Sequence, residues 1–187
     1  KHIAHHFHLP VQSGSDTILK QMNRHYDLAR YKEILSYIRE KVPDMAVTTD
    51  IIVGFPGETE EDFAATLRLL EYARFDMIFS FIYSPRRGTP AAQMPDQIPA
   101  TVQGERFNRL LQVQNEISHA VNAPLYGATV RVLCDGPSKN DASVMSGRTA
   151  SNKIVFFDGA ESDIGRFVNV HVTRADTFAL YGDVVRE

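Results

Sequence analysis

The pattern of the sequence changes at Asn122-Ala123-Pro124, and this change constrains the fold more than any other feature. Before it, segments with helical spacing alternate with runs of apolar and β-branched residues, which is typical of parallel strands joined by helices. After it, glycine-punctuated runs recur about every 8–12 residues and no long helical pattern is present. We therefore predict an α/β domain over 1–122 and a small all-β barrel of about five strands over 123–187.

Three strand–helix units are expected in the first domain. The strands are expected at three places: 2–10, 46–54 and 76–84. Asp27 is expected to cap a helix that Pro43 closes, and Thr59 with Asp62 forms the capping box of the next helix. A proline-rich loop then leads to a third helix over about 101–121.

The cysteine count limits the chemistry of the chain. One cysteine among 187 residues excludes an internal disulfide framework and a cysteine-ligated cluster built by this chain alone. Lys and Arg number 20 against 23 Asp and Glu, so a nucleic-acid-binding surface would need an asymmetric patch. No apolar run is long enough to span a bilayer and no signal peptide is visible, so we expect a cytoplasmic location. Because the chain starts at Lys1, we expect a processed chain or a piece of a longer one.

Polar residues gather on one face of the predicted strands. Alternation along 46–54 places Asp50 opposite the face that suits packing against helices, and His6 and His8 share one face of the first strand. Polar loops follow all three strand ends: PVQSGSD, GFPGET and SPRRGT. Because the carboxyl ends of parallel strands meet at one edge, a single composite site is predicted there. The alternative is that Asp50 is a structural hydrogen-bond acceptor.

Two other clusters are interpreted as structural. Four early histidines resemble a metal site, but period-two alternation separates His5 from His6 and His8, so no metal ligand is predicted: His2, His5, His6, His8. Four acidic residues are expected in the first turn of a helix, where the helix dipole favours negative charge: Glu58, Glu60, Glu61, Asp62.

Four blocks together resemble the radical-SAM methylthiotransferase family, most closely its MiaB type. The blocks are His8–Tyr26, Thr48–Phe63, Phe79–Met94 and Ser146–Phe157. The resemblance covers nearly the whole chain. It implies the C-terminal half of a radical-SAM (β/α)6 partial barrel, with three βα units, followed by a TRAM RNA-binding β-barrel. Cys134 would then be a core residue of a TRAM strand.

The resemblance also implies a function. The intact protein would use S-adenosylmethionine and two [4Fe-4S] clusters to add a methylthio group at C2 of N6-dimethylallyl-adenosine beside the anticodon. Its partners would be the tRNA anticodon stem-loop and an electron donor, with no membrane. The cluster cysteines are expected upstream of Lys1, so this segment would bind no cluster and be inactive alone. The alternatives are a methylthiotransferase for threonylcarbamoyl-adenosine or a ribosomal-protein aspartate, and a non-catalytic RNA-binding module.

Site residues follow from the same resemblance, and none is catalytic. The expected S-adenosylmethionine contacts are Gln12, Ser13, Arg24, Asp50 and Gly54. Arg24 would pair with the methionyl carboxylate and Asp50 would accept from the ribose hydroxyls. The expected RNA contacts are Tyr83, Arg86, Arg87, Arg148, Asn152 and Lys153. The cations available in the second domain are Arg131, Arg148, Lys153, Arg166 and Arg174.

Overall fold

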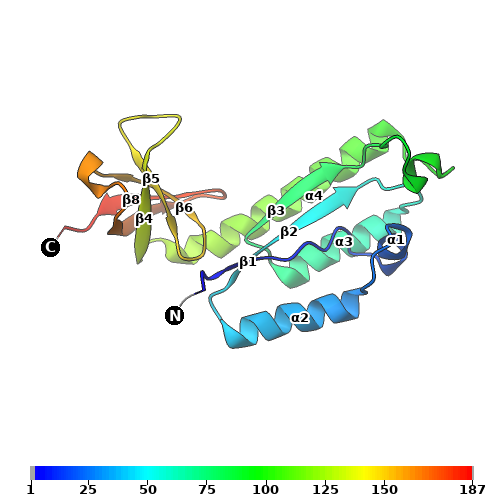
Figure 1. Cartoon of the computed structure of the whole chain (residues 1–187), viewed down its shortest axis with the longest axis horizontal. Coiled ribbons are helices and arrows are strands. Elements are labelled where there is room, and N and C mark those ends of the chain that lie inside the picture. The colour runs from blue at the N-terminus through cyan, green and yellow to red at the C-terminus, as the bar shows by residue number, and fades with distance from the viewer. Residues whose placement is uncertain (1–2, 187) are drawn as a thin grey trace. The chain divides into compact units, whose positions relative to one another are not determined.

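The computed structural model describes residues 3–186, which form two compact units (Figure 1). One unit comprises residues 7–43 and 47–117. The other comprises the residues from 118 on, together with the short N-terminal segment through His6 and residues 44–46. No described helix is both long and apolar enough to cross a membrane.

The first unit is built on a three-stranded sheet. Its strands are β1 (His6–His8), β2 (Ala46–Val53) and β3 (Met77–Ile82), in the order β1-β2-β3. Strands β2 and β3 are parallel, as predicted. The first strand covers only His6–His8 of the predicted 2–10, of which residue 2 lies outside the described residues. It does not extend past the Leu9–Thr48 bond, because Pro10 has no N–H to continue the ladder. The chain resumes parallel pairing only at Gln12, opposite Ile51.

Four helices accompany this sheet: α1 (Asp16–Gln21), α2 (Leu28–Lys41), α3 (Glu60–Ala73) and α4 (Ala100–Asn122). The predicted caps are confirmed. The Asp27 side chain accepts from the N–H of Arg30, and Thr59 with Asp62 forms a reciprocal capping box. Helix α1 was not predicted, and neither was the short 3-10 helix η1 (Pro90–Gln93) in the proline-rich loop.

The two faces of the sheet differ sharply in burial. On β2, the face of Val47, Ile51 and Val53 is buried, in keeping with the predicted packing face. The opposite face carries the partly buried Asp50, and the register places it next to exposed apolar residues of β3. Those exposed residues are Met77, Phe79 and Phe81. The face that carries Asp50 and Phe79 is therefore the more open of the two, and it is named the open face, although Thr48 is buried on it.

The second unit is a closed five-stranded barrel, which confirms the predicted all-β architecture (Figure 1). Its strands are β4 (Thr129–Pro137), β5 (Met145–Thr149), β6 (Ile154–Asp158), β7 (Phe167–Ala175) and β8 (Leu180–Val184). They close in the order β4-β5-β6-β8-β7, with only the β6–β8 pair parallel. Two short 3-10 helices flank them: η2 (Ala123–Leu125) and η3 (Glu161–Asp163).

The barrel interior is filled by apolar side chains, among them Val132, Cys134, Val155, Phe157, Val170, Val172 and Leu180. Cys134 is buried, and burial raises the pKa of its thiol. This confirms the expectation that Cys134 is a core residue. At Gly182, a Cβ would collide with the carbonyl oxygen of His171, so the backbones of β7 and β8 approach too closely for any other residue.

Candidate functional site

The loops after β1, β2 and β3 meet at one end of the sheet, as the sequence predicted. The N–H of Gln12 donates to the carbonyl of Asp50, and the carbonyl of Gln12 accepts from Ile52, both at 2.9 Å. The N–H of Tyr83 donates to the carbonyl of Val53 at 2.8 Å. These bonds tie each strand end to its neighbour in the middle strand.

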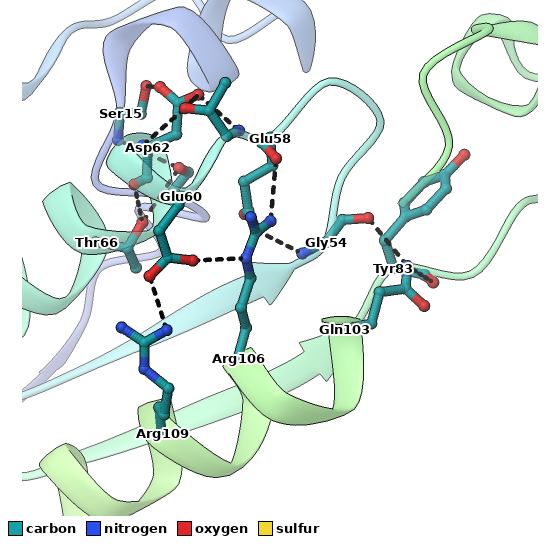
Figure 2. A network of polar contacts seen from close by, with 12 residues as sticks. Ser15, Gly54, Glu58, Glu60, Asp62, Thr66, Tyr83, Gln103, Arg106 and Arg109 are labelled. Atoms are coloured by element: carbon teal, nitrogen blue, oxygen red, sulfur yellow. Dashed lines mark hydrogen bonds and ion pairs between the residues drawn. The ribbon is translucent and has the colours of Figure 1, made fainter. Parts of the chain in front are cut away.

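The first loop is anchored to helix α3 (Figure 2). The N–H of Gly14 donates to the Thr66 hydroxyl at 2.9 Å, and the Ser15 hydroxyl donates to Asp62 Oδ1 at 2.6 Å. Thr59 donates to the other oxygen of the same carboxylate. Burial alone would raise the pKa of Asp62, but these hydrogen bonds hold it below its ordinary value. Asp62 thus joins the loop to the start of the helix.

The second loop is held by a buried ion pair that sequence reasoning missed. Arg106 Nη1 lies 2.9 Å from Glu58 Oε1 and also donates to the Glu58 carbonyl at 3.0 Å. The same carboxylate accepts from the N–H of Gly54 at 3.1 Å. Only 8% of the Arg106 side chain and 2% of the Glu58 side chain are exposed. Burial raises the pKa of Glu58.

This pairing corrects the prediction for Glu58. The helix begins at Glu60 with Thr59 as its N-cap, so Glu58 lies in the preceding loop and not in the first turn. Glu60, Glu61 and Asp62 do occupy that turn, as predicted. Figure 2 shows Arg106 between Glu58 and Glu60, with Arg109 completing the network through Glu60.

Gln103 connects the second and third loops. Its Nε2 donates to the carbonyl of Gly54 at 3.0 Å and lies 3.5 Å from that of Tyr83. Gly54 has a φ of 74°, and a Cβ there would lie 2.5 Å from Gln103 Cγ. This position therefore requires glycine twice over, for its backbone conformation and for the close approach of α4.

Tyr83 is turned inward. Its ring packs edge-on against Phe55 at a centroid distance of 5.2 Å, and its hydroxyl is buried with no hydrogen-bond partner among the described residues. Arg86 and Arg87, which follow it, are exposed. The loop therefore presents two guanidinium groups, while the tyrosine ring contributes to packing.

Asp50 lies on the open face of the sheet. Its Oδ1 is 3.6 Å from His8 Nε2, and His8 Nδ1 is 3.0 Å from the Thr48 hydroxyl. The His8 ring also packs edge-on against Phe79 at 5.6 Å. The Asp50 carboxylate is only partly buried, so it can accept hydrogen bonds from a ligand on this face.

The remaining predicted cofactor residues differ in exposure. Gln12 is buried with a φ of 73°. Ser13 is buried, and its hydroxyl accepts from the N–H of Ser15 and lies 3.5 Å from that of Thr66. Arg24 is exposed and makes no ion pair within residues 3–186. The structure thus places Gln12, Ser13 and Gly54 at the sheet end, and Asp50 lies three residues before the end of β2, joined to Gln12 by a backbone hydrogen bond.

In the barrel unit, two of the predicted RNA residues lie together. Arg148 Nη1 donates to Asn152 Oδ1 at 3.0 Å, and its Nε lies 3.9 Å from Asp135. Lys153 Nζ donates instead to Asn122 Oδ1 at 2.9 Å. Lys153 is therefore engaged within the unit.

Comparisons with known proteins agree with this architecture. Residues 1–70 match the radical SAM superfamily, and residues 125–185 match the TRAM domain. Over 185 residues, 99% of this chain, it is 50% identical to a protein of Alkaliphilus oremlandii named tRNA-2-methylthio-N(6)-dimethylallyladenosine synthase. A protein of the same name from Thermoanaerobacter sp. is 51% identical over 98% of the chain. The chain belongs to the radical-SAM methylthiotransferase family.

The chain covers 39% of the length of each of these two relatives. Among solved structures, it is similar to coproporphyrinogen III oxidase from Escherichia coli, described as a radical SAM enzyme, with a TM-score of 0.49 and 20% identity. That match covers 63% of this chain and 27% of the oxidase. The two domain matches, the named relatives and the closed barrel confirm the predicted family and fold class.

Membership of the radical-SAM methylthiotransferase family implies S-adenosylmethionine and iron–sulfur cofactors, and the residues present fit only the former. Within residues 3–186, no group of three His, Cys, Asp or Glu side chains could hold a metal ion. Cys134 is inside the barrel, and His5 is hydrogen-bonded to Asp44 at 2.8 Å. His2 lies outside the described residues. In contrast, the Asp50 carboxylate suits a ribose, since it can accept from two hydroxyls.

Proposed function

We propose that the protein containing this chain is a tRNA methylthiotransferase that adds a methylthio group at C2 of N6-dimethylallyl-adenosine next to the anticodon. The observation that carries this proposal is 50–51% identity, over nearly all of the chain, to proteins named for that reaction. The anticodon stem-loop is the proposed tRNA partner. We expect other parts of the protein to hold the iron–sulfur cluster. An electron donor is needed to reduce that cluster.

The sheet end is the proposed S-adenosylmethionine contact of this chain. Asp50 accepts from the ribose hydroxyls, and the Gly54 turn lets the ligand approach the backbone closely. Gln12 and Ser13 line the neighbouring loop. Exposed Arg24 pairs with the methionyl carboxylate through its planar guanidinium. The glutamate–arginine network behind Gly54 supports this arrangement because it fixes the loop on both sides.

The remaining predicted residues are assigned to the RNA. Arg86 and Arg87 are exposed at the sheet end and supply charge toward phosphate groups, while Tyr83 supports their loop from within. In the barrel unit, Arg148 and Asn152 form the accessible part of the predicted RNA contact, with Lys153 bonded to Asn122 beside them. These roles follow from exposure and charge.

The cofactor role of Asp50 is tested by substitution in the full-length protein. Asp50→Asn should weaken S-adenosylmethionine binding by about 1–3 kcal/mol, because a charged acceptor is lost from the ribose. Isothermal titration calorimetry measures the change. Asp44→Asn is the matched control, since Asp44 is exposed and its carboxylate is bonded to His5. Equal affinities of wild type and Asp50→Asn would remove Asp50 from the site.

The reaction is tested by nucleoside analysis. Deleting the gene should abolish 2-methylthio-N6-dimethylallyl-adenosine from total tRNA, and the intact gene should restore it, as measured by mass spectrometry of digested tRNA. Loss of a methylthiolated threonylcarbamoyl-adenosine, or of a methylthiolated ribosomal-protein aspartate, would assign a different substrate. No change in any of these products would contradict the enzyme function and leave an RNA-binding role.

A further inference from the structure

The outside of the barrel carries a row of exposed side chains that crosses three strands. Phe167 of β7 is paired with Leu133 of β4, and Leu133 is paired on its other side with Arg148 of β5. Phe167 is 58% exposed, Leu133 is 37% exposed, and 49% of the Arg148 side chain is exposed. The guanidinium of Arg131 lies over the Phe167 ring, 4.0 Å from its centroid. We name Arg131, Leu133, Arg148 and Phe167 the β4–β7 platform.

The charges around this platform are unbalanced in favour of cations. Arg131 makes no ion pair with any described carboxylate, so stacking on Phe167 is what orders its guanidinium. Arg148 has a carboxylate neighbour, Asp135, but at 3.9 Å and half-exposed, so the contact is weak. An apolar row flanked by two guanidinium groups is therefore open to solvent.

Such a surface matches the chemistry of unstacked RNA bases. Bases stack on aromatic rings and on guanidinium planes, and nearby cations attract the phosphates between them. The net charge of the chain is −3, so attraction of RNA depends on local patches of this kind. We propose that the β4–β7 platform binds unpaired nucleotides of the substrate RNA, with Arg131 and Phe167 stacking a base and Arg148 contacting phosphate. This inference rests on the proposed tRNA function.

The barrel offers its own matched control. Arg174 lies over the Tyr181 ring at 3.7 Å, and Tyr181 in turn packs against Phe156 at 5.4 Å. Here the guanidinium is paired with Asp176 at 3.3 Å, and both rings are partly buried. This second arginine–aromatic pair has the same side-chain chemistry, but its rings are less accessible and its guanidinium has a closer carboxylate neighbour.

The test measures binding of the chain to a tRNA anticodon stem-loop that carries 2-aminopurine in the loop. Fluorescence anisotropy gives the affinity, and quenching of 2-aminopurine reports stacking. Phe167→Leu should weaken binding about tenfold and reduce the quenching. Arg131→Lys keeps the charge, so the salt dependence should persist while the affinity falls by about threefold. Phe167→Trp should retain wild-type affinity, which excludes misfolding as the cause.

The control variants show whether RNA binds at the β4–β7 platform or elsewhere on the barrel. Arg174→Lys and Tyr181→Leu should leave affinity within about twofold of wild type, because the Tyr181 ring is partly buried and less accessible to a base. If wild type binds the RNA but Phe167→Leu and Arg131→Lys do not change affinity or quenching, the platform proposal is wrong while the tRNA function stands. If wild type does not bind, the proposed tRNA partner of this chain fails. A change in self-association on Phe167→Leu, seen by sedimentation velocity without loss of RNA affinity, would make the platform a protein interface and overturn the proposal.

Discussion

Glu58 and Arg106 show how much of the sheet end depends on single buried contacts. Glu58 satisfies the N–H of Gly54, and Arg106 neutralises Glu58 from helix α4. A buried carboxylate without its cation is costly, because water is absent to solvate the charge. The pair therefore holds the Gly54 turn in one conformation, which is what a ligand contact through that turn requires.

Arg106→Met tests this dependence. We expect a loss of about 3–5 kcal/mol in the free energy of unfolding, since Glu58 is left buried without its partner. Arg109→Met should cost less than about 1 kcal/mol, because Arg109 pairs with the exposed Glu60. Urea denaturation followed by circular dichroism measures both. Similar losses in the two variants would contradict the buried-pair interpretation.

At this scale, sequence reasoning identified the face of Asp50 but not the role of Glu58. Alternation along a strand is a local property, so the placement of Asp50 opposite Val47 and Ile51 could be predicted from 46–54 alone. The cation that pairs with Glu58 is Arg106 of α4, 48 positions further along the chain. No local periodicity encodes such a pairing, and an acidic residue just before a helix is well explained by the helix dipole.

Among the elements, the N-terminus of helix α3 is bonded both to its own cap and to a loop elsewhere in the first unit. Its capping box satisfies the helix, and the same Asp62 carboxylate accepts from Ser15, in the loop that follows β1. The hydrogen bonds lower the pKa of Asp62, so the folded state favours the ionised carboxylate more than the unfolded state does. The contribution is present above the ordinary aspartate pKa and is lost as pH falls through the lowered folded value.

Asp62→Asn should therefore change the pH dependence of stability. The variant should be less stable than wild type near pH 7, and the difference should shrink as the pH falls below the ordinary aspartate pKa of about 3.9. Urea denaturation across pH 7 to 3 measures the difference. Glu61→Gln is the control, since Glu61 is exposed and bonded only to Arg68 among the described residues. A difference that does not vary with pH would show that Asp62 acts through shape and not through its charge.

Elements with strong local signals were predicted, and short ones were not. Helix α2 begins at the Asp27 cap, and α4 spans the expected periodic run. Both could be predicted because capping and periodicity depend on residues that are close together in the sequence. Helix α1 has six residues, fewer than two turns, which is too short for periodicity to appear. Its start is set by Ser15, whose side chain was interpreted only as part of a polar loop.

For the molecule as a whole, the side chains of this chain suit one cofactor of the family, S-adenosylmethionine, and do not suit the other, the iron–sulfur cluster. The proposed ribose contact, Asp50, belongs to this chain, whereas cluster ligation needs several thiolates and this chain has one cysteine. We expect the purified chain to bind no stoichiometric iron after anaerobic reconstitution with iron and sulfide. Iron analysis and the absorbance near about 410 nm, where thiolate-bound clusters absorb, measure the outcome. Cys134→Ser should behave identically, and a stoichiometric cluster would contradict the assignment.

The order of strands in the barrel has a consequence for how the protein is made. Strand β8 lies between β6 and β7 and is the only partner that joins them. During synthesis, β4 to β7 leave the ribosome while β6 and β7 each still expose one unpaired edge. The barrel can close only when Leu180–Val184 is available to insert, with Gly182 fitting against His171. A ribosome stalled before the codon for Leu180 would thus hold an open, aggregation-prone sheet, and chaperones that shield strand edges would act on this protein in that interval.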